Sequence, residues 1–367
     1  MQHFISASGY YLQTFWAEIL TFGLVIFLHE LGHFLMCRKL GVRVEKFAFG
    51  MGPELFGVTR GETRYSVRAL PLGGFVKLAG EEITDCTGKP DEYYSQAWYR
   101  RLAIVYAGPV MNYLLAFCLF TGVIYWKGLP ETSDEPVIGN LATGFPADRA
   151  GIHIGDRVLS VDGSAVATWK QLSGAVHAKP KKEITLRYSR GGKEFTARLT
   201  TRLDEGSGNG VIGIVSKSTF KPVGPLTAVG EGAAQCYNLT EYTVRTIASK
   251  IHRRQRPDLA GPVGIFQMVH RAAHSGWDDL IFLIGLISVA IGFFNLLPVP
   301  LLDGGWAVMF FWEGISRRKL TTNATNRANS VGLVFLGLLL LFATYSDLLR
   351  WREDHAARPA PAAAATP

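Results

Sequence analysis

The sequence predicts a polytopic α-helical membrane protein with four transmembrane helices, a small membrane-associated β element and one external α/β domain. Its residues are 48% hydrophobic and its mean hydropathy is positive. A helix needs about 20 apolar residues to cross a hydrocarbon core about 30 Å thick. Four stretches come near that length: 15–37, 102–126, 280–302 and 331–349. The last stretch has no polar face that an amphipathic helix could turn to water, which disfavours a soluble fold.

The distribution of basic residues predicts how these helices are oriented. Residues 1–14 contain no Lys or Arg, so they lack the basic start of a cleaved signal peptide, whereas residues 38–101 contain eleven. Because basic residues concentrate in cytoplasmic loops, the N-terminus is expected outside and the first loop inside. With four spans, residues 306–330 are then cytoplasmic, and the segment 127–279 and the C-terminus are external.

Turn residues and strand-like runs predict what lies between the helices. Residues 43–80 hold short β-rich runs broken by Gly and Pro, which indicate a β element at the cytoplasmic membrane face; an ordinary loop is the alternative. Runs at 157–161, 183–188 and 194–200, separated by Gly-containing turns, indicate one small external domain. The predicted boundaries are 1–37 (first helix), 38–101 (cytoplasmic loop), 102–126 (second helix), 127–220 (external domain), 221–279 (external helical segment), 280–305 (third helix), 306–330 (cytoplasmic loop), 331–349 (fourth helix) and 350–367 (disordered tail).

Net charge and cysteine usage exclude two other classes of protein. The net charge is +8, but the basic residues are spread over both predicted sides of the membrane and no nucleic-acid-binding module accompanies them, so no nucleic-acid partner is expected. The four cysteines are scattered over different segments, which indicates neither a disulfide framework nor a Cys-x-x-Cys zinc site.

The first predicted span contains His29-Glu30-Leu31-Gly32-His33, an H-E-x-x-H motif. A spacing of four residues puts both imidazoles on one helix face, where they can bind one zinc ion while Glu30 reaches a water on that ion. In a soluble helix this pattern often arises by chance. Ionisable side chains inside a membrane span each cost about 2 kcal/mol or more unless they are paired or bind a metal, so a metal site is favoured here.

Asp303 is the leading candidate for the third metal ligand, which a catalytic zinc site requires beside one open position. It follows Pro298 and Pro300, which break the third predicted helix, and precedes Gly304 and Gly305, which permit a close turn. The alternative is that Asp303 caps the segment that follows. Both parts of the predicted site lie toward the cytoplasmic side, so they can meet at one depth.

Two further polar or small-residue features accompany these candidates. Asn295 is a poor zinc ligand, but an amide near the metal can hold a substrate backbone or stabilise an oxyanion. An interhelical hydrogen bond is an equally good interpretation of Asn295. The stretch Ala-Gly-Pro-Val-Met-Asn at 107–112 is interpreted as packing near the site, because its small residues allow close helix approach.

Several motifs occur in an order that resembles a known family, the bacterial RseP-type site-2 proteases. The resemblance runs from about residue 15 to residue 349. It is carried by HELGH at 29–33, FGMGP at 49–53, ALPLGGFVKLAGE at 69–81, AGPVMN at 107–112, GPVGI at 261–265 and NLLPVPLLDGG at 295–305.

This resemblance implies a four-span intramembrane zinc metalloprotease of the bacterial inner membrane. It implies that His29, His33 and Asp303 bind one Zn²⁺ and that Glu30 is the catalytic acid and base. The substrates implied are single-span membrane proteins already trimmed outside, including anti-sigma factors, and remnant signal peptides. Both termini are then periplasmic.

The stretch 145–163 looks like part of a periplasmic PDZ domain. Its peptide-binding loop, in a permuted order, is then Gly210, Val211, Ile212, Gly213 and Ile214. Some family members carry two PDZ domains, whereas the external segment here has room for one and so resembles the shorter alphaproteobacterial members. The family commonly has His after Asp-Gly-Gly, where this chain has Trp306, which puts only local contacts in doubt.

Three other functions compete with a protease. A metal transporter also places His and Asp in spans, but it does not need Glu30 or an open coordination position. A membrane-tethered PDZ scaffold with a degenerate site is a second alternative, and the intact Glu30 argues against it. A metallohydrolase for soluble substrates is the third, and it has no need of burial in lipid.

Overall fold

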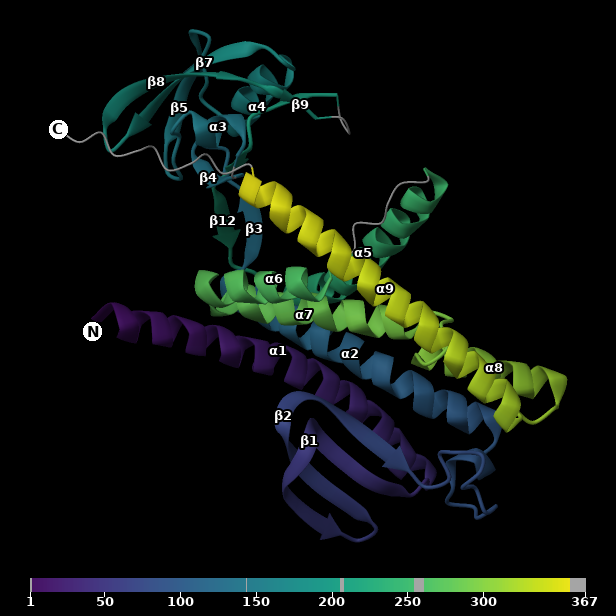
Figure 1. Ribbon diagram of the computed structural model, residues 1–367. Helices are drawn as coiled ribbons and strands as arrows, with labels where there is room; N and C mark the ends of the chain where they lie inside the picture. The colour runs from purple at the N-terminus through teal and green to yellow at the C-terminus, as the bar shows by residue number, and fades with distance from the viewer. Residues whose placement is uncertain (1, 143, 205–207, 254–260, 357–367) are drawn as a thin grey trace. The chain divides into compact units, whose positions relative to one another are not determined.

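The computed structural model describes residues 2–142, 144–204, 208–253 and 261–356. The chain divides into two compact units (Figure 1). The first comprises Met1–Trp126 and Gly224–Arg350, and the second comprises Lys127–Val223 and Trp351–Pro367.

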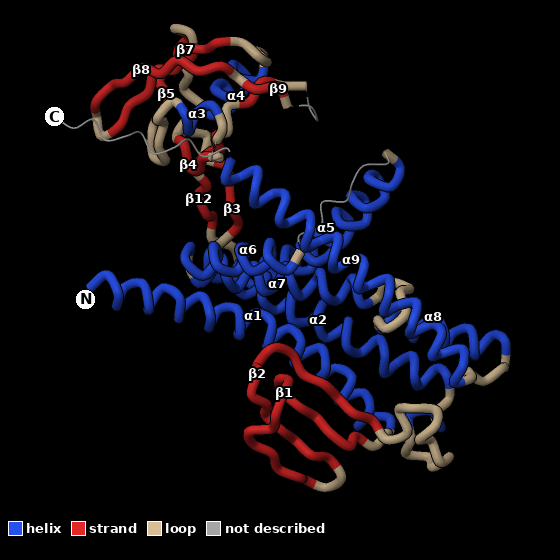
Figure 2. Tube along the Cα trace, in the orientation of Figure 1, coloured by secondary structure: helices blue, strands red, loops and turns tan. Residues whose placement is uncertain are grey.

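Helices dominate the first unit, as the blue segments of Figure 2 show. They are α1 (Gln2–Leu40), α2 (Trp98–Lys127), α5 (Pro225–His252), α6 (Pro262–Ser275), α7 (Trp277–Asn295), α8 (Asp303–Ser316), α9 (Thr322–Ala356) and the short 3-10 helix η1 (Tyr93–Ser95). Within the described residues, four segments are long and apolar enough to cross a membrane: Gln13–Leu40, Trp98–Lys127, Trp277–Asn295 and Thr322–Leu349. These four confirm the predicted number of spans.

The third predicted helix and the loop after it differ from the sequence prediction. Helix α7 ends at Asn295 rather than at residue 305. The chain between α7 and α8 contains Pro298 and Pro300, which have no N–H group to donate to a helical hydrogen bond. A new helix, α8, occupies most of the predicted loop 306–330 and begins at Asp303. Helix α8 is apolar, but with only 14 residues it is too short to cross the hydrocarbon core of a membrane.

The fourth helix is longer than predicted, and most of its apolar segment is exposed in the described part of the chain. Helix α9 starts at Thr322 and continues to Ala356, into the predicted tail 350–367, of which residues 357–367 lie outside the described part of the chain. Its apolar side chains include Leu333 and Leu341, which are 67% and 68% exposed. Such a surface suits contact with hydrocarbon rather than water.

A buried carboxylate attaches α9 to α6. Asp347 on α9 is buried and accepts hydrogen bonds from the backbone N–H groups of Gly261 and Gly264, at 3.1 and 2.8 Å. These N–H groups belong to the start of α6, where the helix itself offers them no acceptor. The GPVGI motif therefore fixes one end of the last span.

The predicted β element is present as two long strands, β1 (Val44–Arg60) and β2 (Thr63–Leu78). The first part of β1 pairs with two different parts of β2, since Phe47 lies opposite both Tyr65 and Val76. The ribbon therefore folds into a small curled sheet, which packs β2 against α1 (Figure 1). In this sheet the end of β2, residues 74–78, forms an edge.

The second unit is built around antiparallel strands. Four of them form a sheet in the order β6-β5-β7-β8, and the remaining strands pair two by two. Buried apolar side chains from Ile138 to Ile212 fill its core, and Leu172 of α4 is fully buried among them. The strands are β3 (Leu129–Thr132), β4 (Ile138–Leu141), β5 (Arg157–Val161), β6 (Ser164–Ala165), β7 (Glu183–Arg190), β8 (Lys193–Thr200), β9 (Arg202–Leu203), β10 (Gly210–Val211), β11 (Ile214–Ser216) and β12 (Ser218–Lys221), and the helices are α3 (Pro146–Arg149) and α4 (Trp169–His177). The three predicted strand-like runs coincide with β5, β7 and β8.

Candidate metal centre

The two histidines of the H-E-x-x-H motif lie side by side on α1. Their ring centroids are 4.8 Å apart, and the Nε2 atoms of His29 and His33 are 3.2 Å apart. This is the arrangement expected of an i, i+4 pair on a helix face. Both side chains are largely buried, so their lone pairs face the interior of the first unit.

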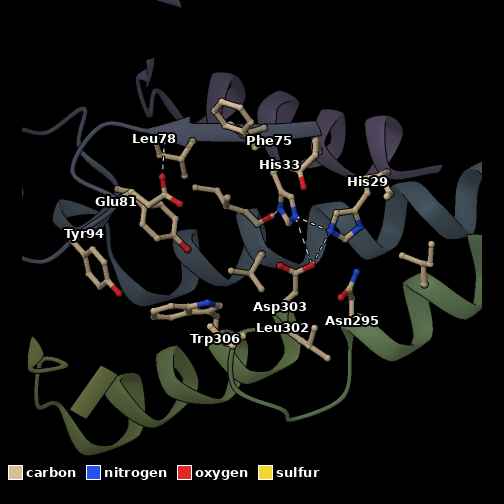
Figure 3. A pocket seen from close by; sticks show the side chains of 18 residues that line it. His29, His33, Phe75, Leu78, Glu81, Tyr94, Asn295, Leu302, Asp303 and Trp306 are labelled. Carbon is tan, nitrogen blue, oxygen red and sulfur yellow. Dashed lines mark hydrogen bonds and ion pairs between the residues drawn. The ribbon is translucent and has the colours of Figure 1, made fainter. Parts of the chain in front are cut away.

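Asp303 reaches the two imidazoles from the start of α8. Its Oδ2 atom lies 3.1 Å from His29 Nε2 and 3.6 Å from His33 Nε2 (Figure 3). The approach depends on the glycines that follow: a Cβ on Gly304 would stand 2.2 Å from the carbonyl oxygen of Leu297. The alternative interpretation of Asp303 as a helix cap is wrong in detail, because the capping position is Leu302 and Asp303 is the first helical residue.

The other nitrogen of each imidazole contacts α2. His33 Nδ1 is 2.8 Å from the carbonyl oxygen of Ile104, and because a carbonyl can only accept, this nitrogen carries the proton. His33 Nε2 is therefore left with a lone pair. His29 Nδ1 lies 3.2 Å from the side-chain amide of Asn112.

The stretch 107–112, interpreted from the sequence as packing near the site, passes directly over the ligand candidates. A Cβ on Gly108 would stand 2.3 Å from His33 Nε2 and 2.8 Å from His29 Cε1. On α1, a Cβ on Gly32 would stand 2.3 Å from the carbonyl oxygen of Ala107. Both helices therefore need glycine at their closest approach, as small-residue packing between membrane helices requires.

Geometry and donor chemistry both fit a divalent cation. The ligand atoms of His29, His33 and Asp303 all lie within 4.8 Å of one another, and no other such group occurs in the described part of the chain. Asp303 Oδ2 is buried, and its nearest polar neighbours among the described residues are the two imidazole Nε2 atoms, at 3.1 and 3.6 Å. A cation between these atoms would bind the bare Nε2 of His33 and the carboxylate together, and a set of two His and one carboxylate is typical of catalytic zinc.

A cavity of about 590 Å³ opens beside this cluster. Glu30 lines it next to the two histidines, and Val76 on β2 lines it too. Figure 3 shows Asn295 beside Asp303 and places Trp306 on the same side of the cavity as Leu302. The other lining residues include Ile26, Phe75, Leu78, Glu81, Tyr93, Tyr94, Ile104, Val105, Ile291 and Leu301.

The candidate peptide-binding loop lies in the second unit, and the structure does not connect it with a ligand. Gly210 and Val211 form β10 and Ile214 begins β11, whereas Ile212 is 1% exposed and belongs to the core. Gly213 has a φ of +81°, a backbone conformation that favours glycine.

Sequence reasoning missed Ile104 and Asn112 as contacts of the ligand candidates. Asn112 carried a usable signal, since it is a polar side chain inside an apolar span and lies four residues after Gly108, on the same helix face. The carbonyl of Ile104 carried none, because every residue has a carbonyl.

Four segments long and apolar enough to cross a membrane, together with a His-His-Asp cluster that has a carboxylate beside it, are features of a membrane metalloenzyme. A family comparison names the class more closely: residues 17–339 match the model of peptidase family M50. The chain belongs to this family of metalloproteases.

Two relatives of this chain have names that describe them as proteases, in agreement with the family. A candidate zinc metalloprotease of Clostridium acetobutylicum is 33% identical over 90% of this chain and 96% of its own length. The regulator of sigma-W protease RasP of Bacillus subtilis is 27% identical over 93% of this chain and 99% of its own length.

One solved structure that resembles part of the chain is a PDZ domain. It belongs to an SdrC-like protein of Listeria monocytogenes, is 24% identical and matches 23% of this chain and 90% of that domain with a TM-score of 0.21.

Proposed function

We propose that this chain is an intramembrane zinc protease that hydrolyses peptide bonds in or near the transmembrane segments of single-span membrane proteins. The observation that carries the proposal is the position of Glu30, a carboxylate beside the His29, His33 and Asp303 cluster in a helix long enough to cross a membrane. A metal transporter or a PDZ scaffold does not need this carboxylate.

His29, His33 and Asp303 are the residues that would hold one Zn²⁺ per chain. When bound, zinc supplies a Lewis acid that polarises a carbonyl and lowers the pKa of a water molecule. Three protein ligands leave one coordination position open for this chemistry.

Glu30 is the residue that would move protons. It lies beside the histidines, within the same cavity, where its carboxylate can take a proton from the attacking water and return it to the leaving amine. Asn295 lines the same cavity, and its amide can orient the substrate backbone or donate to an oxyanion.

The edge of β2 supports a role in unwinding the substrate. A helical substrate has its carbonyls already hydrogen-bonded, so it must become extended before cleavage. Residues 74–78 form a sheet edge whose Phe75, Val76 and Leu78 line the metal cavity. The N–H of Leu78 points away from β1 and donates to Glu81 Oε2 at 3.1 Å. A substrate strand added at this edge would lie beside Glu30.

The proposed location is the bacterial inner membrane, with both termini and the second unit periplasmic. The basic residues in 38–101 and 306–330 support this orientation. The substrates proposed are anti-sigma factors already trimmed outside and remnant signal peptides. The Bacillus subtilis relative is named as a regulator of sigma-W, which supports the former. The second unit is proposed to bind a peptide through Gly210, Val211, Ile212, Gly213 and Ile214, or to act as a size filter.

The test is cleavage of a single-span reporter that lacks a large external domain, with purified wild-type protein and the Glu30→Gln variant in detergent. We expect the variant to lose cleavage and to keep one zinc per chain, because glutamine keeps the shape of the side chain but cannot accept the proton. Equal cleavage by both proteins, or no zinc in either, would reject the proposal and favour the scaffold.

A further inference from the structure

The side chain of Asn112 is buried in the interior of the first unit and faces a metal-ligand candidate. It is 0% exposed, and its Nδ2 atom lies 3.2 Å from His29 Nδ1. Its Oδ1 atom is buried without a hydrogen-bond partner in the part of the chain that the structure describes. The nitrogen and oxygen of an amide have nearly the same shape, so the side chain fits equally well when it is turned over.

The two amide orientations have opposite consequences for His29. If Nδ2 faces the imidazole, it donates to Nδ1, the imidazole proton lies on Nε2, and Oδ1 stays unpaired. A protonated Nε2 has no lone pair for a metal, and this lone pair is what separates the two orientations, because either one leaves one end of the amide unpaired in the described structure. If Oδ1 faces the imidazole, it accepts from the Nδ1–H, and Nε2 is free to bind.

His33 already shows the second arrangement. Its Nδ1 can only donate to the carbonyl of Ile104, so its Nε2 lone pair points toward Asp303. A pair of histidines that bind one cation must both present a bare Nε2, since both Nε2 atoms lie within 3.6 Å of the same Asp303 oxygen.

The position of Asn112 is set by a neighbouring helix. Ser288 on α7 donates a hydrogen bond of 2.8 Å to the backbone carbonyl of Asn112, and both residues are fully buried. A Cβ on Gly292, one turn further along α7, would stand 3.3 Å from the Cβ of Asn112. Helix α7, which precedes Asp303 in the chain, therefore also packs against Asn112, the residue that contacts His29.

We infer that Asn112 is a positioning residue of the metal centre: its Oδ1 accepts the Nδ1 proton of His29 and so directs the Nε2 lone pair to the cation. This inference rests on the proposed function, because it requires that His29 binds the metal. An acceptor behind a metal-bound histidine fixes the orientation of the ring, and its loss typically weakens metal binding by about 10–100-fold.

The test compares Asn112→Leu with Asn112→Asp in the purified full-length chain, by zinc affinity in competition with a chelator and by the visible spectrum of the Co²⁺-substituted protein. Leucine keeps the volume and removes the acceptor, so we expect zinc binding about 10–100-fold weaker and an altered cobalt spectrum. Aspartate has only acceptors, so we expect zinc affinity within about threefold of wild type or tighter, and a preserved cobalt spectrum.

Two outcomes would overturn the inference. Zinc affinity unchanged in Asn112→Leu would show that the contact does not matter. Zinc affinity lost equally in Asn112→Asp would show that the imidazole accepts from an amide N–H, or that Asn112 is needed only for packing. If the leucine variant does not fold, the aspartate variant alone still separates an acceptor from a donor.

Asn329 on α9 provides the matched control. Its Oδ1 is also buried without a partner among the described residues. The cavity that it lines adjoins the metal cavity but is not lined by His29, His33 or Asp303, so Asn329→Leu should leave zinc affinity and the cobalt spectrum unchanged. These measurements use no substrate. A chain whose zinc affinity depends on Asn112 as expected, but which does not cleave the reporter, would therefore reject the proposed protease and keep this inference.

Discussion

Both units of this chain bury clusters of apolar side chains, and the first unit adds close polar and glycine contacts between its helices. In the first unit, helices meet through polar and small residues: Asn112 on α2 contacts His29 on α1, and Ser288 on α7 contacts the backbone of α2. In the second unit, the strands and α4 enclose a cluster of apolar side chains, including Ile184 and Leu172, both fully buried.

The difference follows from the solvent of each unit. In water, apolar side chains gain free energy by leaving the surface, so a core of Leu, Ile and Val selects the fold. In lipid the surroundings are as apolar as the side chains, so close packing at glycines and interhelical hydrogen bonds select which helix faces meet. The membrane unit should thus be sensitive to single atoms at its polar contacts, and the second unit to lost apolar volume.

The largest effect is expected for Gly108→Ala in the membrane unit. The added Cβ would stand 2.3 Å from His33 Nε2, so the imidazole must move away from its partners. We expect zinc binding to weaken by about 100-fold or more, measured by competition with a chelator. Gly122→Ala on the same helix is the control, because a Cβ there has no neighbour within 4 Å in the described structure. Wild-type affinity in Gly108→Ala would contradict the close helix approach.

Leu172→Ala is the corresponding destabilising substitution in the second unit. Removing a fully buried leucine from its apolar core should destabilise this unit by about 2–5 kcal/mol, seen as easier denaturant unfolding and faster proteolysis within 127–223. Zinc content should remain at the wild-type level. The exposed Lys170→Ala on the same helix should change stability by less than about 0.5 kcal/mol. Zinc loss in Leu172→Ala would show that the two units do not fold independently.

A smaller effect is expected in the first unit, where the stability of the loop 86–92 should depend on pH through the Glu92 carboxylate. The hydroxyl of Thr87, the thiol of Cys86 and the N–H groups of Gly88 and Thr87 bond to the Glu92 carboxylate and lower its pKa from 4.5 to about 2. A lowered pKa stabilises the folded loop fully above pH 4.5, and this stabilisation falls as the pH drops toward 2.

Hydrogen exchange at the amides of Thr87, Gly88 and Lys89, corrected for intrinsic rates, measures this effect. We expect protection to decline between about pH 4.5 and 2 in the wild type. In Glu92→Gln protection should be lower at neutral pH and nearly independent of pH, because glutamine does not titrate. The same pH profile in both proteins would show that another group holds the loop.

The smallest effect is expected for Gly174→Ala in the second unit. Gly174 lies inside α4, and a Cβ there would meet no neighbour within 4 Å in the described residues. Alanine restricts the unfolded chain more than glycine does, so we expect a gain of about 0.5–1 kcal/mol in unfolding free energy, read as a higher denaturant midpoint. Together with Gly108→Ala, it shows the same substitution acting in opposite directions in the two units. A destabilised Gly174→Ala protein would mean that this face of α4 is covered.

Local sequence determined much of this protein. The length of the apolar stretches predicted four spans, because a helix that crosses lipid needs a run of residues that composition alone reveals. The spacing of His29 and His33 predicted their shared helix face, since helical periodicity is a local property. Turn residues and β-rich runs likewise predicted β1, β2 and the strands β5, β7 and β8.

Only the tertiary structure decided where one helix ends near the site and which groups contact the ligand candidates. The sequence predicted a break at Pro298 and Pro300 within a third segment bounded at residue 305. The structure ends α7 at Asn295, before both prolines, and begins a new helix, α8, at Asp303. That Ile104 and Asn112 lie against His33 and His29 depends on how α2 is rotated and how closely it approaches α1. Contacts between residues 71 and 83 positions apart are set by packing between helices, which no local pattern records.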